Sequence, residues 1–463
     1  MKKIKIITMS ILFFLCFLLV GCGSNESNKR NYLTFYVWGD SQELSWYEAI
    51  AKEYENEYGV EVKVQPNSGD YYNNLNIKLG SKKSAPDIFF TETGEIQGQL
   101  NQKKLLNLSD YIKSGAIDIV SDSNPNGKIK LWDINDCYRY DGNNLGSGDY
   151  YALIKDWSPD FVMWYNKNHI DEYNEENGFK EGDEGFINYP SEEIPMTWDE
   201  FYELSYKLTK KVNGVTRYGT MLDRVPWKHL MEFIQMNGSS LFDSERKYIN
   251  SSDEKVIEAF KFFIDLQKGE KASAPEIGVS SIGSGEAFAN GNTTFVWFGS
   301  WAYSNYFWNS VPFEIGMAPA PVPKKDRPLT KEDTYLAASG LISLAICADS
   351  PVKDEAVKFL NFYMTYGEEY MAKKGFNIPG NELVAKSDIF RNPENSRLRK
   401  INNYFYNLAL NYTHSLTYNK YLSQILVENQ IAKNVSTWFN NYSAETYESV
   451  LEKIRKDVMN EID

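Results

Sequence analysis

The sequence of 463 residues has few of the side chains and motifs that enzymes commonly use for catalysis. Its three histidines, His169, His229 and His414, stand far apart in the chain. No G-x-S-x-G elbow, G-x-x-x-x-G-K-[ST] loop, G-x-G-x-x-G or H-E-x-x-H sequence is present. These absences argue against serine hydrolases, P-loop and dinucleotide-binding enzymes and zinc proteases. A glycosidase-type carboxylate pair stays open, because the chain holds 63 acidic residues.

Positive charge and cysteine are also scarce. The chain has 49 lysines and arginines against 63 acidic residues, which gives a formal net charge of −14. Since a nucleic-acid backbone is bound by clustered lysine and arginine, we expect no nucleic-acid partner. Of the four cysteines, Cys137 and Cys347 lie outside the N-terminal segment, and either a disulfide or two buried thiols would be consistent with them.

The N-terminus begins like an export signal. Lys2, Lys3 and Lys5 precede an apolar run over residues 6–20, which is shorter than a membrane-spanning helix requires. The sequence LVGC that follows, ending at Cys22, resembles the lipobox of bacterial lipoproteins, whose cysteine becomes the lipid-carrying N-terminus. We therefore predict a signal peptide over 1–21, lipidation of Cys22, a flexible tether over 22–30 and anchoring on the outer face of the cell membrane. A secretory signal with an incidental cysteine is the alternative.

The rest of the chain has the pattern of an α/β protein. Residues 33–38 are rich in β-formers, residues 41–58 carry apolar side chains at helical spacing up to Gly59, and valines alternate over 60–64. This order predicts a strand–helix–strand unit of an open parallel sheet. A chain of this length normally forms more than one core. Further strands are predicted over 86–90, 161–165, 293–298 and 340–346, and helices from capping boxes at 197–200 and 251–254.

One loop has the spacing of a metal site. In DSNPNGKIKLWD, residues 122–133, oxygen-bearing side chains stand at loop positions typical of calcium-binding loops, with glycine at the sharp turn. The predicted ligands are Asp122, Asn124, Asn126 and Asp133. Pro125 departs from that pattern, and only two of the ligands are charged. A surface loop that turns at residues 126–127 explains the same residues more simply.

Aromatic side chains stand among polar ones at the predicted strand ends. Trp38, Trp157, Trp227 and Trp301 each follow a predicted strand, near the edge of an open α/β sheet where ligands bind. Tryptophan can stack on the apolar face of a sugar ring while neighbouring polar groups bond the hydroxyls. The alternative is core packing, which we expect for Trp297 because it lies inside a strand.

The order and spacing of several segments resemble the extracellular solute-binding proteins of ABC importers, of the carbohydrate-binding type known as family 1. Ile154, where proline is common, and Ser300, which separates Gly299 from Trp301, depart from the family pattern. The matching segments are WGD (38–40), SGDYYNNLNIKLGSKKSAPDIFF (68–90), YYALIKDWSPDFVMWYNKNHID (150–171), PMTWDEF (195–201), EAFANGNTTFVWFGSWAY (286–303) and ASGLISLAICADSPVKDEAVKFLNFY (338–363).

The resemblance implies a two-lobed fold, with two open α/β sheets joined by a hinge and the ligand in the cleft between them. We expect lobe 1 to comprise 31–152 plus 322–378 and lobe 2 to comprise 153–321 plus 379–463, with crossings near Tyr151, residues 319–323 and Pro379. The implied function is capture of a sugar and delivery to a membrane permease by hinge closure, as a monomer without catalytic activity or a required cofactor. The number of aromatic residues favours an oligosaccharide.

Position in the family's cleft implies the ligand-binding residues. For Asp87, capping of a strand end is an equal alternative, and Arg224 could instead be a salt-bridge partner. A secreted glycan-processing enzyme, a binding protein that feeds a sensor kinase and a binder of a non-sugar solute remain alternative functions. The implied ligand-binding residues are Trp38, Asp40, Asp87, Thr91, Glu92, Trp157, Asp160, Arg224, Trp227, Trp301, Ser339 and Gly340.

Overall fold

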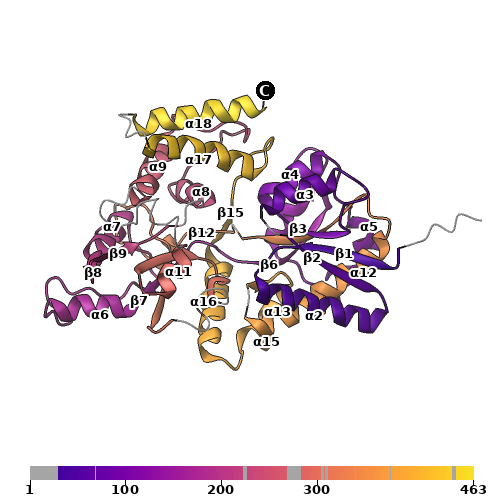
Figure 1. Ribbon diagram of the computed structural model, residues 1–463, viewed down its shortest axis with the longest axis horizontal. Coiled ribbons are helices and arrows are strands. Elements are labelled where there is room, and N and C mark those ends of the chain that lie inside the picture. The colour runs from indigo at the N-terminus through magenta and orange to yellow at the C-terminus, as the bar shows by residue number, and fades with distance from the viewer. Residues whose placement is uncertain are drawn as a thin grey trace, which may run out of the picture.

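The computed structural model places two lobes side by side, each built around its own β-sheet (Figure 1). It describes residues 30–67, 69–222, 227–267, 283–303, 307, 311–338, 340–375, 377–440 and 445–462. The predicted signal peptide and Cys22 lie outside these residues, as does most of the tether. Within the described ranges, no helix combines the length and apolar character needed to cross a membrane.

Lobe 1 has a six-stranded sheet in the order β14-β6-β13-β3-β1-β2. β1 pairs in parallel with β2 and β3, and α2 (Ser41–Tyr58) connects β1 to β2, so the predicted strand–helix–strand unit is confirmed. β13 runs antiparallel to both β3 and β6. The strands are β1 (Tyr32–Val37), β2 (Glu61–Pro66), β3 (Ile88–Glu92), β6 (Ala152–Trp157), β13 (Ile342–Ile346) and β14 (Ile378–Pro379).

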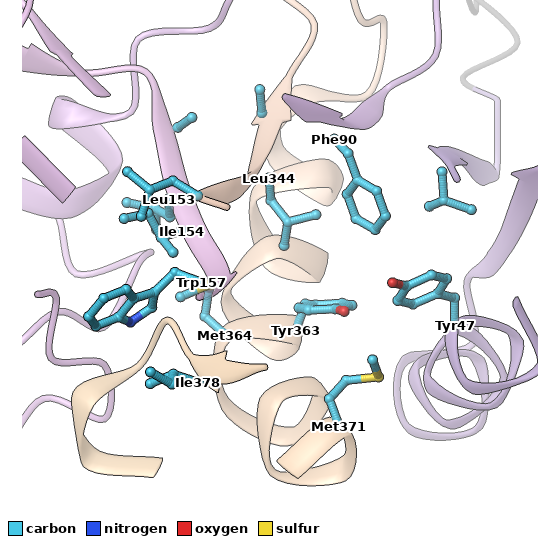
Figure 2. Close-up of a cluster of buried hydrophobic side chains, with 14 of the residues drawn as sticks. Tyr47, Phe90, Leu153, Ile154, Trp157, Leu344, Tyr363, Met364, Met371 and Ile378 are labelled. Atoms are coloured by element: carbon cyan, nitrogen blue, oxygen red, sulfur yellow. The ribbon is translucent and has the colours of Figure 1, made fainter. Parts of the chain in front are cut away.

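Helices cover both faces of this sheet (Figure 1). α3 (Tyr71–Leu79) and α4 (Thr93–Asn101) lie on one face, and α2, α12 (Lys353–Phe362) and α13 (Glu368–Lys374) lie on the other. α2 ends at Gly59 because its φ of +72° is the left-handed conformation that glycine adopts without strain. Figure 2 shows how Tyr47 of α2, Phe90 of β3 and Tyr363 pack together beneath the sheet.

Lobe 2 has a five-stranded sheet in the order β11-β7-β10-β9-β8. Its strands are β7 (Val162–Asn166), β8 (Lys210–Val212), β9 (Val215–Thr220), β10 (Thr293–Phe298) and β11 (Ile315–Ala318). Its helices are α6 (Lys167–Glu176), α7 (Trp198–Lys207), α8 (Trp227–Met236), α9 (Glu254–Gln267), α11 (Ser284–Ala289), α17 (Gln424–Asn440) and α18 (Tyr447–Ile462).

One of the two predicted capping boxes is confirmed. Thr197 and Glu200 bond each other's backbone N–H groups at the start of α7. At α9, the cap is Asp253 instead of Ser251, because the Asp253 carboxylate accepts the N–H groups of Lys255 and Val256. The Ser251 hydroxyl donates to Glu452 Oε2 and so ties α9 to α18.

The lobes share a hinge layer in which α16 (Ser396–Tyr412) packs against both. The Phe405 ring lies 5.5 Å from Trp164 in lobe 2, and the Tyr406 ring lies 6.1 Å from Trp132 in lobe 1. Beside α16, β12 (Leu336–Ala338) pairs in parallel with β15 (Thr413–Ser415). Lobe 1 also carries η1 (Asp133–Tyr138) and a hairpin of β4 (Arg139–Tyr140) and β5 (Asp149–Tyr150).

All three predicted crossings need correction, because strand pairing places them later in the chain. β6, expected to belong mostly to lobe 2, pairs with β13 in the sheet of lobe 1. Residues 319–323 lie in lobe 2, where Val322 O accepts the N–H of Trp198, so the second crossing falls between β12 and β13. Pro379 lies in β14 of lobe 1, and the third crossing runs through α16.

The two cysteines of the described chain are free thiols. Cys347 is buried beyond β13, and Cys137 is half-buried in η1. Burial raises the pKa of both thiols. Of the two alternatives that the sequence left open, the structure therefore favours separate thiols.

Candidate functional site

Several strands of the lobe 1 sheet end on the side that faces lobe 2. β1, β3 and β6 run in the same direction, so Trp38, Thr93 and Ser158 follow their carboxyl ends on this one side of the sheet. Open α/β sheets bind ligands on this side. The polar and aromatic side chains here are therefore the candidates for ligand contact.

An aromatic group forms the lobe 1 side. The half-buried Trp38 packs against Tyr71, Tyr72 and Phe90, with ring centroids 4.5, 5.9 and 5.0 Å away. The Tyr71 hydroxyl is occupied, since it lies 3.0 Å from Phe90 N and O. The Tyr72 hydroxyl is buried without a hydrogen-bond partner among the described residues. Burial, and next the charge of Glu92, raise the pKa of Tyr72. This hydroxyl therefore keeps its proton and can donate a hydrogen bond to a ligand.

A second group lies where the chain crosses between the lobes. Trp301 of lobe 2 donates its indole N–H to Asp160 Oδ1 over 2.9 Å, and Asp160 is 5% exposed. A Cβ at Gly340 would lie 2.7 Å from both Asp160 carboxylate oxygens, and one at Gly299 would lie 2.5 Å from Oδ1. Only glycine at these two positions leaves room for the Asp160 carboxylate. A ligand contact at Gly340 stays a prediction.

Four of the predicted ligand-binding residues have scaffold roles in the structure. Asp40 caps α2, where its Oδ1 accepts the N–H groups of Gln42 and Glu43 at 2.8 Å. Thr91 is fully buried in β3 and donates to Gln99 Oε1. Trp157 is 1% exposed and packs on Trp132 at 5.3 Å, among the core residues of Figure 2.

Asp87 is the fourth. It precedes β3, so it lies at the end of the sheet opposite the cleft. Its buried carboxylate pairs with Arg30 and accepts the N–H and hydroxyl of Thr34 at 2.7 and 2.8 Å and the Ser350 hydroxyl at 2.7 Å. These bonds give Asp87 the strand-end role that the sequence left open.

Three predicted residues cannot be placed fully. Arg224 and Ser339 lie outside the described residues. Trp227 begins α8, and its side chain is likewise outside the description. Glu92 is half-buried at the end of β3, where α4 begins.

The two lobes touch where α4 of lobe 1 meets α17 of lobe 2. Glu95 of α4 accepts the N–H of Ile425, in the first turn of α17, at 3.3 Å. A Cβ at the neighbouring Gly94 would lie 2.4 Å from Gln424 Cβ, so glycine permits the close approach. Burial, and next the charge of Glu92, raise the pKa of Glu95 to about 8. The lobes are therefore in direct contact at this point.

A half-open pocket of about 250 Å³ lies between the lobes, here called the side pocket. Thr93 and Gln97 of α4 and residues of η1 form its lobe 1 wall, and Arg246 and Tyr418 come from lobe 2. Sequence reasoning missed these four residues. Thr93 directly follows Glu92, which the sequence did predict, but only the folded chain brings the four residues together.

Hydrogen bonds between polar groups connect the two lobes at the hinge. Asn377 Nδ2 donates to Asp156 Oδ1 at 2.9 Å, and the Ser300 hydroxyl donates to Asn377 Oδ1 at 3.0 Å. Ser300 N–H in turn donates to the Ser158 hydroxyl at 3.0 Å. This chain of bonds links β6 in lobe 1 to the segment after β10 in lobe 2.

The three histidines have surroundings typical of scaffold residues. Burial lowers the pKa of His169 to about 3, and the ring lies between Asn166 and Thr294 at 3.0 Å from each. His229 packs on Phe161 at 4.7 Å between ring centroids. His414 stacks on Tyr335 at 4.4 Å.

The predicted calcium loop is exposed at Asp122, Asn126 and Asp133. Asn124 uses its amide N–H to bond Asp118 Oδ1 and Ile119 O, at 2.8 and 3.2 Å. Over the described ranges, no three His, Cys, Asp or Glu side chains cluster so as to hold a metal. Calcium binding by Asp122, Asn124, Asn126 and Asp133 stays a prediction.

Comparison with known proteins gives a family and a fold. Residues 38–370 match the model of a family described as bacterial extracellular solute-binding protein. An ABC substrate-binding protein from Listeria monocytogenes in complex with cycloalternan is similar over 93% of this chain and 98% of its own, with a TM-score of 0.73 and 18% identity. The GacH receptor of Streptomyces glaucescens, solved unliganded and with acarbose, is similar over 93% and 99%, with a TM-score of 0.70 and 17% identity.

A maltose-bound MalE3 of T. maritima is similar over 92% of this chain and 98% of its own, with a TM-score of 0.67 and 17% identity. A comparison with curated protein sequences finds no match. These structural likenesses confirm the two-lobed α/β fold that the sequence predicted.

Proposed function

Because this chain belongs to the family of bacterial extracellular solute-binding proteins, we propose that it captures an oligosaccharide between its lobes and delivers it to an ABC permease. The observation that carries the sugar assignment is the pairing of aromatic faces with unused polar atoms along the cleft. Trp38 and Trp301 are half-buried, and the buried Tyr72 hydroxyl has no partner among the described residues. Stacking on a ring face and bonding to hydroxyls are the two contacts that a sugar needs.

Hinge closure would couple binding to delivery. A ligand that contacts both lobes stabilises only the closed arrangement, so binding shifts the population toward the form that a permease can distinguish. The contact between Glu95 and Ile425 lies on the closing surface. The hydrogen bonds among Ser158, Ser300 and Asn377 lie close to the points where the chain crosses between the lobes. A small rotation there produces a large displacement at the parts of the lobes distant from the hinge.

We further propose that Cys22 carries a lipid that holds the protein at the membrane. An extended chain from Cys22 to Arg30 spans at most about 28 Å. Arg30 is tied to Asp87 in lobe 1. The anchor would therefore keep lobe 1 close to the membrane and to the permease. Stable anchoring takes about two acyl chains.

The test is a thermal-shift screen of residues 24–463, which contain every described element of both lobes. The panel holds monosaccharides, linear oligosaccharides, amino acids, peptides and polyamines, each with and without calcium. A ligand at 100 times its Kd adds about 2.7 kcal/mol to the free energy of unfolding. We expect a shift with one class of oligosaccharide and recovery of that sugar chemically unchanged.

The other outcomes separate the alternatives. A cleaved sugar would favour a glycan-processing enzyme. A response to peptides or polyamines without any response to sugars would overturn the carbohydrate assignment but leave the family intact. A shift with calcium alone would favour a metal site at residues 122–133. A transport assay with the neighbouring permease distinguishes delivery from signalling to a sensor kinase.

A further inference from the structure

The side pocket adjoins the Asp160–Trp301 group and extends the cleft. Leu341 lines the pocket, and Gly340 before it contacts the Asp160 carboxylate. Tyr418 of lobe 2 lines the pocket and also approaches Gly94 at the contact between the lobes. A ligand held between Trp38 and Trp301 could therefore extend into this pocket.

Two buried polar side chains in its wall have atoms without partners. Thr93 is 6% exposed, and its hydroxyl has no hydrogen-bond partner among the described residues. Gln97 is 5% exposed, and its amide N–H₂ donates to Asn101 Oδ1 at 3.0 Å, whereas its carbonyl oxygen has no partner in the same part of the chain. Buried polar groups are nearly always hydrogen-bonded, so these two atoms are suited to a ligand's hydroxyl groups.

Arg246 supplies the third polar contact from lobe 2. Its φ of +56° is unusual for a residue other than glycine, and the turn is held by bonds from Arg246 N–H to Asp243 O and from Lys420 N–H to Arg246 O, at 2.8 and 2.9 Å. No described carboxylate pairs with its guanidinium. A guanidinium presents a fork of N–H donors, which can bond two neighbouring sugar hydroxyls at once.

The loop of the hairpin of β4 and β5 forms part of the pocket wall. Leu145 and Gly146 of its loop line the pocket, and Asn144 Oδ1 accepts from Lys420 Nζ of lobe 2 at 3.2 Å. Within the loop, Asp141 accepts the N–H groups of Asn143 and Asn144 at 2.8 Å and the Ser147 hydroxyl at 3.0 Å. These bonds hold the loop in place as a wall.

We infer that the side pocket receives the terminal sugar of a linear oligosaccharide, with Arg246, Thr93 and Gln97 as its polar contacts and the hairpin loop as the wall that stops the chain. The pocket of about 250 Å³ is smaller than the roughly 300–1,000 Å³ of sites that enclose a whole small-molecule ligand, so it suits one end of an oligosaccharide and not its whole length. This inference rests on the proposed function and deepens it, because it predicts that the ligand must have a free end.

The test compares Arg246→Gly with the wild type by calorimetry. Glycine removes the guanidinium and suits the positive φ, so the backbone should not be strained. Asn213→Gly is the matched control, because Asn213 also has a positive φ, of +52°, in the turn between β8 and β9. The probes are linear malto- and manno-oligosaccharides from disaccharide to hexasaccharide, and α-cyclodextrin, a ring of glucose units without an end.

We expect linear sugars to bind the wild type and the Asn213→Gly protein equally, and to bind Arg246→Gly about tenfold or more weakly. We expect Thr93→Val to weaken binding in the same direction, and α-cyclodextrin not to bind. If linear sugars bind but Arg246→Gly retains wild-type affinity, or if the ring binds as well as the linear chain, this inference is wrong and the proposed function stands. If no sugar of the panel binds, the carbohydrate assignment fails as well.

Discussion

Asp87 and Asp160 are both buried aspartates beside predicted strands, yet their surroundings differ. Asp87 pairs with Arg30, Thr34 and Ser350, all within lobe 1. Asp160 accepts the indole N–H of Trp301 from lobe 2 and is enclosed by Gly299 and Gly340. The first arrangement lies within lobe 1, whereas the second lies where the chain crosses between the lobes. The sequence predicted both as ligand residues, because it could not show which partners each would meet.

Trp301→Ala tests the aromatic side of the cleft. Removing a stacked, desolvated aromatic ring should weaken ligand binding by about 1 to 3 kcal/mol, measured by calorimetry with the sugar found in the screen. Tyr58→Ala is the control, since Tyr58 is exposed at the end of α2 far from the cleft. Unchanged affinity in Trp301→Ala would remove Trp301 from the site.

Glu95→Gln tests the pH dependence of the contact between the lobes. The pKa of Glu95 is raised from 4.5 to about 8, so the folded protein keeps the proton that the unfolded chain loses above about pH 4.5. Holding this carboxyl group protonated lowers the free energy of unfolding. The loss is absent below about pH 4.5, grows as the pH rises and reaches its full size near pH 8. The shift of about 3.5 pKa units, at about 1.4 kcal/mol per unit, sets an upper bound of about 5 kcal/mol. Glu95→Gln should therefore be more stable than wild type by a few kcal/mol at pH 8 and equal at pH 4.

The measurement is denaturant unfolding at several pH values. Exposed Glu48→Gln controls for the loss of one carboxylate. A difference between Glu95→Gln and wild type that does not change with pH would contradict the assignment.

At the scale of elements, α4 and α17 form a direct contact between the lobes. The three atoms nearest to a Cβ at Gly94 belong to side chains of the other lobe, Gln424 and Tyr418. Gly94→Ala should therefore oppose closure without disturbing lobe 1. We expect weaker ligand binding and a larger radius of gyration in X-ray scattering, with little loss of stability in the absence of ligand.

A second substitution makes this prediction specific. Gln424→Gly removes the side chain that the new methyl group would meet, so Gly94→Ala combined with Gln424→Gly should regain affinity. Failure of the pair to recover would indicate that Gly94→Ala acts within α4 and not across the cleft.

The predicted helices and strands were largely correct where their positions depend on residues close together in the sequence. The alternating valines of β2, the capping box at Thr197 and the left-handed Gly59 depend on residues a few positions apart, and the structure confirms them. The cap of α9 was misplaced by two residues, because Ser251 bonds Glu452 of α18 and leaves the cap to Asp253. That exchange depends on a partner far along the chain.

At the scale of the whole molecule, the anchor decides where the protein acts. Cys22→Ser in the full chain should move the protein from the membrane fraction to the soluble fraction, measured by fractionation of cells that express it. Ligand affinity should not change, because the tether joins lobe 1 at Arg30, at the sheet end opposite the cleft. Persistent membrane association of Cys22→Ser would refute the lipobox interpretation.

The sequence by itself determined the α/β class and most element positions, because strand alternation, helical periodicity, caps and turns depend on neighbouring residues. The family and the two-lobed fold followed from the resemblance of several segments, in their order and spacing, to the extracellular solute-binding proteins. Only the tertiary structure decided where the chain crosses between lobes, because pairing of β6, β13 and β14 sets the crossings. It also decided which side chains face the cleft. The contact of Glu95 with Ile425 and the side pocket of Thr93, Gln97 and Arg246 join residues far apart in the chain, and no local pattern encodes such a meeting.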